Sequence, residues 1–148
     1  VNIHQRFKFF NKIKDFFGTL NGKTCAVWGL SFKPNTDDIR EAPSVDIVEK
    51  LIDEGVSINV NDPVAMENFK KRFGKKVDYF NNNYDALIDV DFLVINTEWS
   101  IYRQPNFDLI KKNMKSPIIF DGRNLYNKFK LKELGFYYSN VGYIPSDD

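Results

Sequence analysis

The sequence has little of the chemistry that is easiest to recognise. It contains one cysteine, Cys25, and one histidine, His4, among 148 residues. This scarcity excludes a disulfide scaffold, a zinc site with the usual ligand spacing, and a catalytic pair of neighbouring cysteine and histidine residues. Cys25 lies within an apolar segment, so we expect a small buried side chain in a protein of a reducing compartment. We predict no metal site and no catalytic residue in this chain.

The sequence also lacks an excess of either charge and any long apolar run. It has 21 lysine and arginine residues against 20 aspartate and glutamate residues, a net charge of +1. Such a balance gives no field that would gather a polyanion. The basic segment 70–76 is interpreted as a solvated helix end. No apolar run can span a bilayer, and the first residues do not resemble a signal peptide. We predict a cytoplasmic protein that binds neither nucleic acid nor membrane.

The chain begins without a methionine, and its first segment has no helix-capping residue. Apolar side chains recur there at helical spacing as far as Phe17, and Gly18 ends the pattern. So broad an aromatic face needs a partner. The helix can pack on its own domain, or it can be the end of a longer helix that leads to another domain, which the abrupt start favours. We expect a piece of a longer protein, with residues 1–21 as the end of a connecting helix and 22–148 as a domain.

The rest of the chain alternates between strand-like and helix-like segments. Apolar or alternating runs predict strands near residues 23–30, 56–60, 77–80, 92–95, 116–120 and 136–139. Helical spacing predicts helices near residues 43–54, 64–73, 84–88, 107–114 and 128–134. Connections of this length indicate right-handed crossovers instead of hairpins. The predicted fold is a three-layer α/β/α Rossmann-like domain with a mostly parallel sheet of about five or six strands, preceded by an N-terminal helix.

The first strand–helix–strand unit lacks the glycines of a dinucleotide-binding site. An acidic residue after its second strand, Asp62, is in the place of a ribose ligand. However, none of the eight glycines forms a Gly-x-Gly pair. The turn after the first strand carries Lys33 and Pro34, where a dinucleotide needs close approach of the backbone. Asp62 is therefore interpreted as a helix cap within the turn Asn61–Pro63.

A long polar loop, residues 29–44, leaves the carboxyl end of the first strand, where open α/β sheets bind their ligands. The loop contains two cations among three acidic residues: Lys33, Arg40, Asp37, Asp38 and Glu41. In one interpretation each cation pairs with a loop carboxylate, which contributes little at a surface. In the other, Lys33 binds a phosphate and Arg40 acts as a planar fork for a pyrophosphate, while the carboxylates orient these cations.

A third cation, Arg123, follows Gly122 at the end of a later predicted strand. The topology can bring it to the edge of the sheet that holds Lys33. The simpler alternative is a salt bridge to Asp121. Two cations converging on one diphosphate would each add about 1.5–3 kcal/mol of charge-assisted hydrogen bonding, enough for micromolar binding but not for chemistry.

These segments resemble a known family. The sequence of residues 27–44, Val-Trp-Gly-Leu-Ser-Phe-Lys-Pro-Asn-Thr-Asp-Asp-Ile-Arg-Glu-Ala-Pro-Ser, closely resembles the signature of the carboxyl-terminal domain of UDP-glucose/GDP-mannose dehydrogenases. Asn61–Pro63, Thr97–Trp99 and Phe120–Leu125 agree with the family as well. Val1–Gln5 resembles the end of the central helix that joins the halves of such enzymes and carries their dimer contact. The likeness is greatest to bacterial UDP-glucose 6-dehydrogenases, although GDP-mannose and UDP-N-acetylhexosamine enzymes share the scaffold.

The resemblance implies a three-domain enzyme that uses two NAD molecules to oxidise the C6 hydroxyl of a nucleotide sugar to a carboxylate, through an aldehyde held by a catalytic cysteine. The cysteine motif and the NAD-binding glycines would belong to the amino-terminal and central domains, so this domain alone would be inactive. By position, Phe32, Lys33 and Arg123 would contact the UDP-sugar, and Arg40 would contact NAD across an interdomain cleft. The full-length protein would form a homodimer. A free-standing nucleotide-binding module is the alternative.

Overall fold

The computed structural model describes residues 3–140, with side chains from residue 7 onward. Six strands form one sheet in the order β3-β2-β1-β4-β5-β6, and each neighbouring pair is parallel. They are β1 (Thr24–Trp28), β2 (Ser57–Asn61), β3 (Asp78–Tyr79), β4 (Phe92–Ile95), β5 (Ile118–Asp121) and β6 (Tyr137–Asn140). The predicted parallel sheet is confirmed, and it has six strands.

Helices connect the strands. The α-helices are α1 (Ile3–Phe17), α2 (Pro43–Asp53), α3 (Met66–Phe73), α4 (Ser100–Arg103), α5 (Phe107–Asn113) and α6 (Lys128–Glu133). Two 3₁₀ helices, η1 (Gly74–Lys76) and η2 (Asp85–Leu87), complete the set within residues 3–140. The sequence pattern did not predict α4, which has four residues and too short an apolar period to be recognised.

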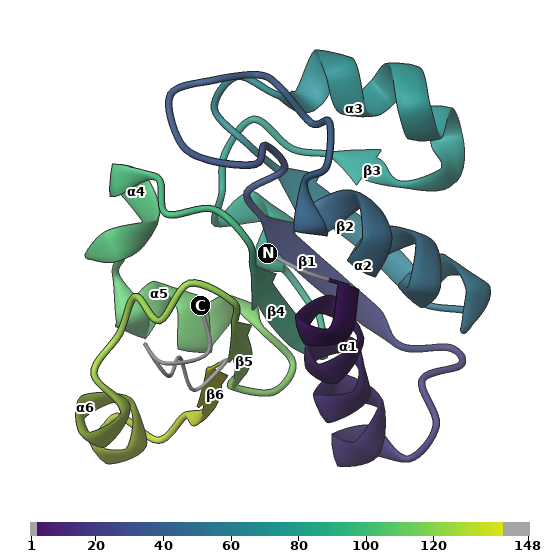
Figure 1. Cartoon of the computed structure of the whole chain (residues 1–148). Coiled ribbons are helices and arrows are strands. Elements are labelled where there is room, and N and C mark those ends of the chain that lie inside the picture. Colours follow the sequence, from purple (N-terminus) through teal and green to yellow (C-terminus); the bar gives the residue numbers. More distant parts are fainter. Residues whose placement is uncertain (1–2, 141–148) are drawn as a thin grey trace.

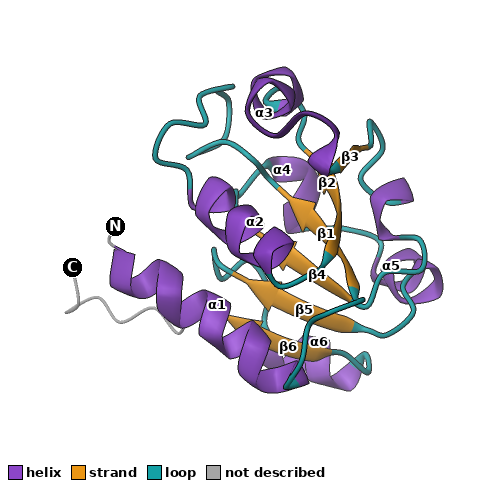
Figure 2. Ribbon diagram, turned by 90° about the vertical axis from the view of Figure 1, so that its right-hand side faces the viewer, coloured by secondary structure: helices purple, strands orange, loops and turns teal. Residues whose placement is uncertain are grey.

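Both faces of the sheet are covered, which gives the expected three layers (Figures 1 and 2). Successive residues of β1 alternate between the faces: Cys25 and Val27 belong to a core with α1, α2 and α3, whereas Ala26 and Trp28 belong to a core with η2, α4, α5 and α6. Strands buried on both sides need apolar residues at nearly every position. This requirement explains the continuous apolar runs in the sequence.

The N-terminal helix α1 packs on this domain. Phe9, Phe10 and Ile13 are buried in the core that α1 shares with α2 and the sheet, and Phe16 meets Phe120 of β5 edge to face with ring centroids 5.9 Å apart. Packing on its own domain, one of the two possibilities for the aromatic face, is therefore observed. The segment Val1–Gln5, which resembles the connecting helix, lies outside the described side chains, and the domain boundary near residue 21 stays a prediction.

The order of the strands places a topological switch point between β1 and β4. From β1 the chain proceeds to β2 and β3 on one side, and it then crosses to β4 on the other side of β1. Loops that leave the carboxyl ends of these two strands diverge, and such points are where open α/β sheets bind ligands. No helix within residues 3–140 has the length and apolar character needed to cross a membrane.

Candidate functional site

The carboxyl edge of the sheet gathers the loops that carry the predicted site residues. Lys33 lies in the loop after β1, and Arg123 lies in the loop after β5. Only β4 separates these two strands, so their ends are roughly 10 Å apart at the usual spacing between strands. The expectation that the topology brings both cations to one edge is confirmed.

A close backbone contact fixes the switch point. Gly29 has a φ of 96°, and a Cβ atom on it would lie 2.5 Å from Cβ of Thr97, in the loop after β4. Only glycine fits both the left-handed conformation and the space. The Thr97 hydroxyl also donates a hydrogen bond to the Ser31 carbonyl at 2.8 Å. The loops after β1 and β4 are therefore held directly against each other.

Lys33 is the predicted cation that remains available. Within residues 7–140 its ammonium group has no hydrogen-bond or ion-pair partner, and its side chain is exposed. The adjacent Phe32 is also exposed, with 42% of its surface accessible. The backbone beneath them is ordered by a bond from Phe32 N–H to the Asp38 carbonyl at 3.1 Å and by one from the Ser31 hydroxyl to the Lys33 carbonyl at 2.8 Å. Two successive residues of the loop thus expose an aromatic ring and an unpaired positive charge.

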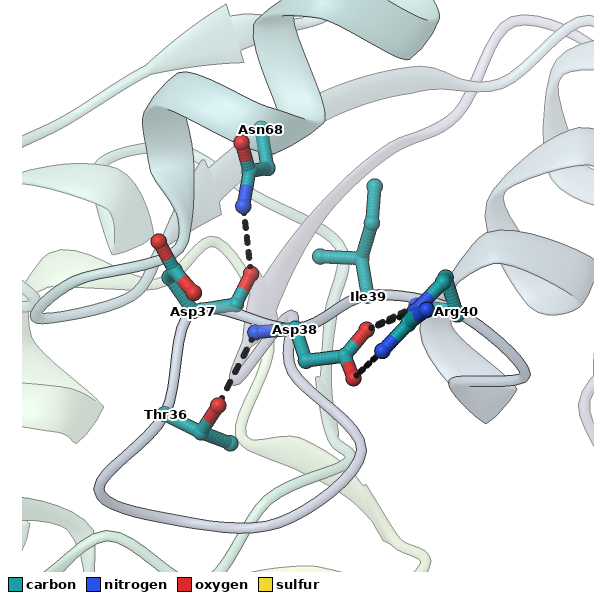
Figure 3. A pocket seen from close by; sticks show the side chains of 6 residues that line it. All are labelled: Thr36, Asp37, Asp38, Ile39, Arg40 and Asn68. Atoms are coloured by element: carbon teal, nitrogen blue, oxygen red, sulfur yellow. Dashed lines mark hydrogen bonds and ion pairs between the residues drawn. The ribbon is translucent and has the colours of Figure 1, made fainter.

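Arg40 pairs with a carboxylate of its own loop. Its Nε and Nη2 atoms donate to the two oxygens of Asp38 at 3.0 and 2.8 Å, as Figure 3 shows. The hydrogen bonds from Arg40 lower the pKa of the Asp38 carboxyl to about 2. The Arg40 side chain is nevertheless 87% exposed. It lines an open hollow of about 570 Å³ beside α3, where Asn68 donates to the Asp37 carbonyl at 2.8 Å.

Arg123 pairs with Glu98 from the loop after β4, with its Nε atom 2.8 Å from Oε1 of Glu98. The salt bridge to Asp121 that the sequence offered as an alternative is wrong. Asp121 is fully buried and its carboxylate instead accepts the backbone N–H groups of Arg123 and Leu125, both at 2.7 Å, and the Tyr138 hydroxyl at 2.6 Å. Burial raises the pKa of the Asp121 carboxyl, and these donors oppose that shift. Asp121 thus shapes the loop, and Glu98 orients the guanidinium.

The interpretation of Asp62 as a helix cap is wrong, because the N-cap of α3 is Ala65 and no side chain caps the helix. Asp62 instead accepts hydrogen bonds in the turn that leads into α3. Its Oδ1 atom accepts the N–H groups of Val64 and Ala65, both at 2.9 Å. The helix itself begins only at Met66. The second oxygen, Oδ2, faces the loop after β1, which the sequence did not indicate.

Cys25 is a buried apolar side chain, as predicted. It is fully buried in β1, and burial raises the pKa of its thiol far above the ordinary value. A thiol that stays protonated is not a nucleophile. Within the described residues, no group of three or more histidine, cysteine, aspartate or glutamate side chains is arranged to hold a metal ion.

The family described as "UDP-glucose/GDP-mannose dehydrogenase family, UDP binding domain" matches residues 26–128, which include all three cations. The chain belongs to this dehydrogenase family. It is 40% identical over 147 residues to a UDP-glucose 6-dehydrogenase of Pseudomonas aeruginosa, covering 95% of this chain and 32% of that protein. It is 34% identical over 142 residues to the UDP-glucose 6-dehydrogenase TuaD of Bacillus subtilis, and this match covers 96% of this chain and 31% of TuaD.

The fold of this family member also matches a solved dehydrogenase. The structure of a UDP-glucose dehydrogenase from Pyrobaculum islandicum superposes with a TM-score of 0.80 at 28% identity, covering 95% of this chain and 30% of that one. The chain therefore spans about a third of the length of the relatives that it matches. It corresponds to the UDP-binding domain of the dehydrogenase family.

Two contacts of the site were not predicted from the sequence. Glu98 and the second function of Asp62 depend on contacts between loops that are 25 and 32 residues apart in the chain. Glu98 lies in the Thr97–Trp99 segment that already resembled the family, so the similarity marked the position without indicating its partner. Only the order of the strands reveals that partner.

Proposed function

We propose that this chain is the sugar-nucleotide-binding domain of an NAD-dependent UDP-glucose 6-dehydrogenase. That enzyme converts UDP-glucose, water and two NAD⁺ into UDP-glucuronate, two NADH and three protons. In this proposal Phe32, Lys33 and Arg123 bind the substrate, and the chemistry takes place on other domains of the same protein. The observation that carries the proposal is the free, exposed Lys33 beside Phe32, opposite Arg123 on the carboxyl edge.

The cations account for recognition of the diphosphate. Lys33 supplies a point charge, and Arg123 supplies a guanidinium whose edge away from Glu98 still carries N–H donors. Each charged hydrogen bond is worth about 1.5–3 kcal/mol, or roughly tenfold to a hundredfold in affinity. The names of the similar bacterial proteins support UDP-glucose as the substrate.

Within residues 7–140, the chain fits a contact to NAD at Arg40 and not at the turn after β1. The turn after β1 has no Gly-x-Gly pair, and the backbone N–H groups of Leu30 and Ser31 in that turn already donate to Asp62. This turn therefore does not fit a bound dinucleotide. Arg40, exposed on the same loop, fits a contact to NAD that is held mainly by another domain. NAD, when bound, accepts the hydride of each oxidation step. We further propose a homodimeric, cytoplasmic full-length enzyme.

The proposal is tested with the full-length protein that contains this chain. Formation of NADH is followed with UDP-glucose, UDP-N-acetylglucosamine and GDP-mannose, and we expect the highest kcat/KM with UDP-glucose. A higher kcat/KM with one of the other two sugar nucleotides would assign the protein to the enzymes of this family that oxidise that sugar. No NADH with any of the three would favour a nucleotide-binding module without catalysis.

The role of the cations is tested in the same assay. Lys33→Ala and Arg123→Ala should each reduce kcat/KM for UDP-glucose by about tenfold or more, because each removes a charged hydrogen bond. Lys76→Ala, which removes a lysine from the short helix η1, is the matched control and should leave it unchanged. Unchanged kinetics in both site variants would contradict the assignment.

A further inference from the structure

The buried carboxylate of Asp62 joins three loops of the carboxyl edge. Its Oδ2 atom accepts Leu30 N–H at 2.7 Å and Ser31 N–H at 3.4 Å, both in the loop after β1. The same oxygen accepts the indole N–H of Trp99 at 3.2 Å, from the loop after β4. With Oδ1 bound in the loop after β2, one side chain connects the segments that follow β1, β2 and β4.

The charge of Asp62 is balanced by these donors. The residue is 1% exposed, and within residues 7–140 it forms no ion pair. A buried carboxylate is costly unless it is hydrogen-bonded. A cap for the turn before α3 would need only one of the two oxygens. The second oxygen is used on the segment that leads directly into Phe32 and Lys33.

The backbone of Leu30 and Ser31 is held from the opposite direction as well. The Ser44 hydroxyl, at the start of α2, donates to the Leu30 carbonyl at 2.6 Å, and the Thr97 hydroxyl donates to the Ser31 carbonyl at 2.8 Å. All four backbone polar groups of these two residues therefore bond to side chains of other elements. Fixing the chain before binding lowers the entropy that binding must remove.

We propose that Asp62 is a positioning residue of the sugar-nucleotide site: it fixes residues 30–31 so that Phe32 and Lys33 are presented over the carboxyl edge. The proposal rests on the function proposed above. In a dinucleotide-binding turn the corresponding N–H groups face a pyrophosphate. Here they face an internal carboxylate, so an external diphosphate must be met by side-chain cations. Because the Asp62 carboxylate takes the place of a bound pyrophosphate at these N–H groups, there is a physical reason for the presence of Lys33 and Arg123.

The test is the kinetics of Asp62→Asn in the full-length enzyme. In the wild type, the N–H groups of Leu30, Ser31 and Trp99 donate to a carboxylate oxygen. In Asp62→Asn they face either an NH₂ group, which cannot accept, or an amide oxygen, which is a weaker acceptor. We expect KM for UDP-glucose to rise about tenfold, while kcat and KM for NAD change by less than about twofold. Thr97→Val, which keeps the shape and removes only the bond to Ser31, should raise KM for UDP-glucose by about threefold.

A control separates positioning from general stability. Asp91→Asn alters a carboxylate that accepts Thr24 N–H at 2.9 Å at the opposite edge of the sheet. It should lower the melting temperature and leave both KM values unchanged. Unchanged KM for UDP-glucose in folded Asp62→Asn and Thr97→Val would overturn the positioning role while the proposed function stands. If Asp62→Asn does not fold, Thr97→Val decides. A wild-type enzyme that oxidises no nucleotide sugar would overturn both proposals.

Discussion

The two edges of the sheet hold their loops in different ways. At the amino edge the connections are mostly between backbone groups, as in the bond from Gly22 N–H to the Gly55 carbonyl at 3.1 Å. The carboxylate of Asp91 is partly exposed there and has a lysine, Lys115, 4.0 Å away. The carboxyl edge has such backbone pairs as well, for example from Gly29 N–H to the Asn61 carbonyl at 2.9 Å, but there buried side chains add further hydrogen bonds between loops from different strands.

The distribution of buried polar groups makes the same contrast. Tyrosines aside, the buried polar and charged side chains within residues 7–140 are Ser31, Ser44, Asn61, Asp62, Asn96, Thr97 and Asp121. All of them lie at the carboxyl edge, at the end of a strand or the start of α2. Such groups stabilise a structure only when their partners are in place. The loops at the amino edge are therefore held mainly by the conformation of the backbone, whereas the loops at the carboxyl edge also depend on the identity of particular buried side chains.

The largest expected effect concerns the glycine at the switch point. Gly29→Ala places a methyl group against Thr97 and forces alanine into a left-handed conformation, which together should lower the free energy of unfolding by roughly 2–5 kcal/mol. Gly22→Ala, at the amino edge, has a similar φ of 85° and no atom within 4 Å, so it should cost only about 1–2 kcal/mol. Urea denaturation measures both. Equal losses would show that the two edges do not differ in packing.

The next effect concerns the loop that carries Arg123. Tyr138→Phe removes the hydroxyl that donates to the buried Asp121 carboxylate at 2.6 Å and accepts Tyr126 N–H at 3.2 Å. We expect a loss of roughly 1.5–3 kcal/mol, mainly because the short bond to Asp121 is charge-assisted. The pKa of Asp121 should also rise further, since this bond opposes the effect of burial.

Tyr79→Phe is the matched control, because its hydroxyl donates to the neutral Gly74 carbonyl at 2.8 Å. It should cost about 0.5–1.5 kcal/mol. A thermal denaturation series at neutral pH compares the two. A loss for Tyr138→Phe no greater than that for Tyr79→Phe would contradict the special role of the Asp121 carboxylate.

The smallest effect is at the exposed tip of the β1 loop. Arg40→Ala should raise the pKa of Asp38 from about 2 part of the way toward its ordinary value near 3.8, because the side-chain hydrogen bonds from Arg40 are the largest cause of its low pKa and the backbone N–H of residue 40 remains. The lowered pKa means that the pair favours the folded state above pH 3.8 and that this contribution is lost as the pH falls toward 2. Stability at neutral pH should change little, since the pair is exposed.

An NMR titration of the Asp38 carboxyl carbon measures this shift. Arg103→Ala removes another exposed cation and should leave the Asp38 titration unchanged. The same midpoint for Asp38 in wild type and Arg40→Ala would rule out the Arg40 side chain as the cause.

The parts of the site that the sequence predicted follow from local patterns and strand order. Apolar runs indicated parallel strands, and parallel strands place Lys33 and Arg123 at one edge. The pairing of Arg123 with Glu98 and the second oxygen of Asp62 could not be predicted, because they depend on which loops lie side by side. Local spacing favoured Asp121 as the partner of Arg123, but a carboxylate two residues away is better placed to accept the backbone N–H of Arg123.

The central claim is that the carboxyl edge binds the sugar nucleotide. The most direct measurement is a titration of the ¹⁵N-labelled chain with millimolar UDP-glucose, followed by NMR. We predict shifts of the backbone amides in the segments 30–33, 97–99 and 121–124, with the amides of 22–24, 90–92, 115–116 and 118 unmoved. Shifts concentrated at the amino edge, or no shifts at the carboxyl edge, would contradict the claim that the carboxyl edge binds the sugar nucleotide.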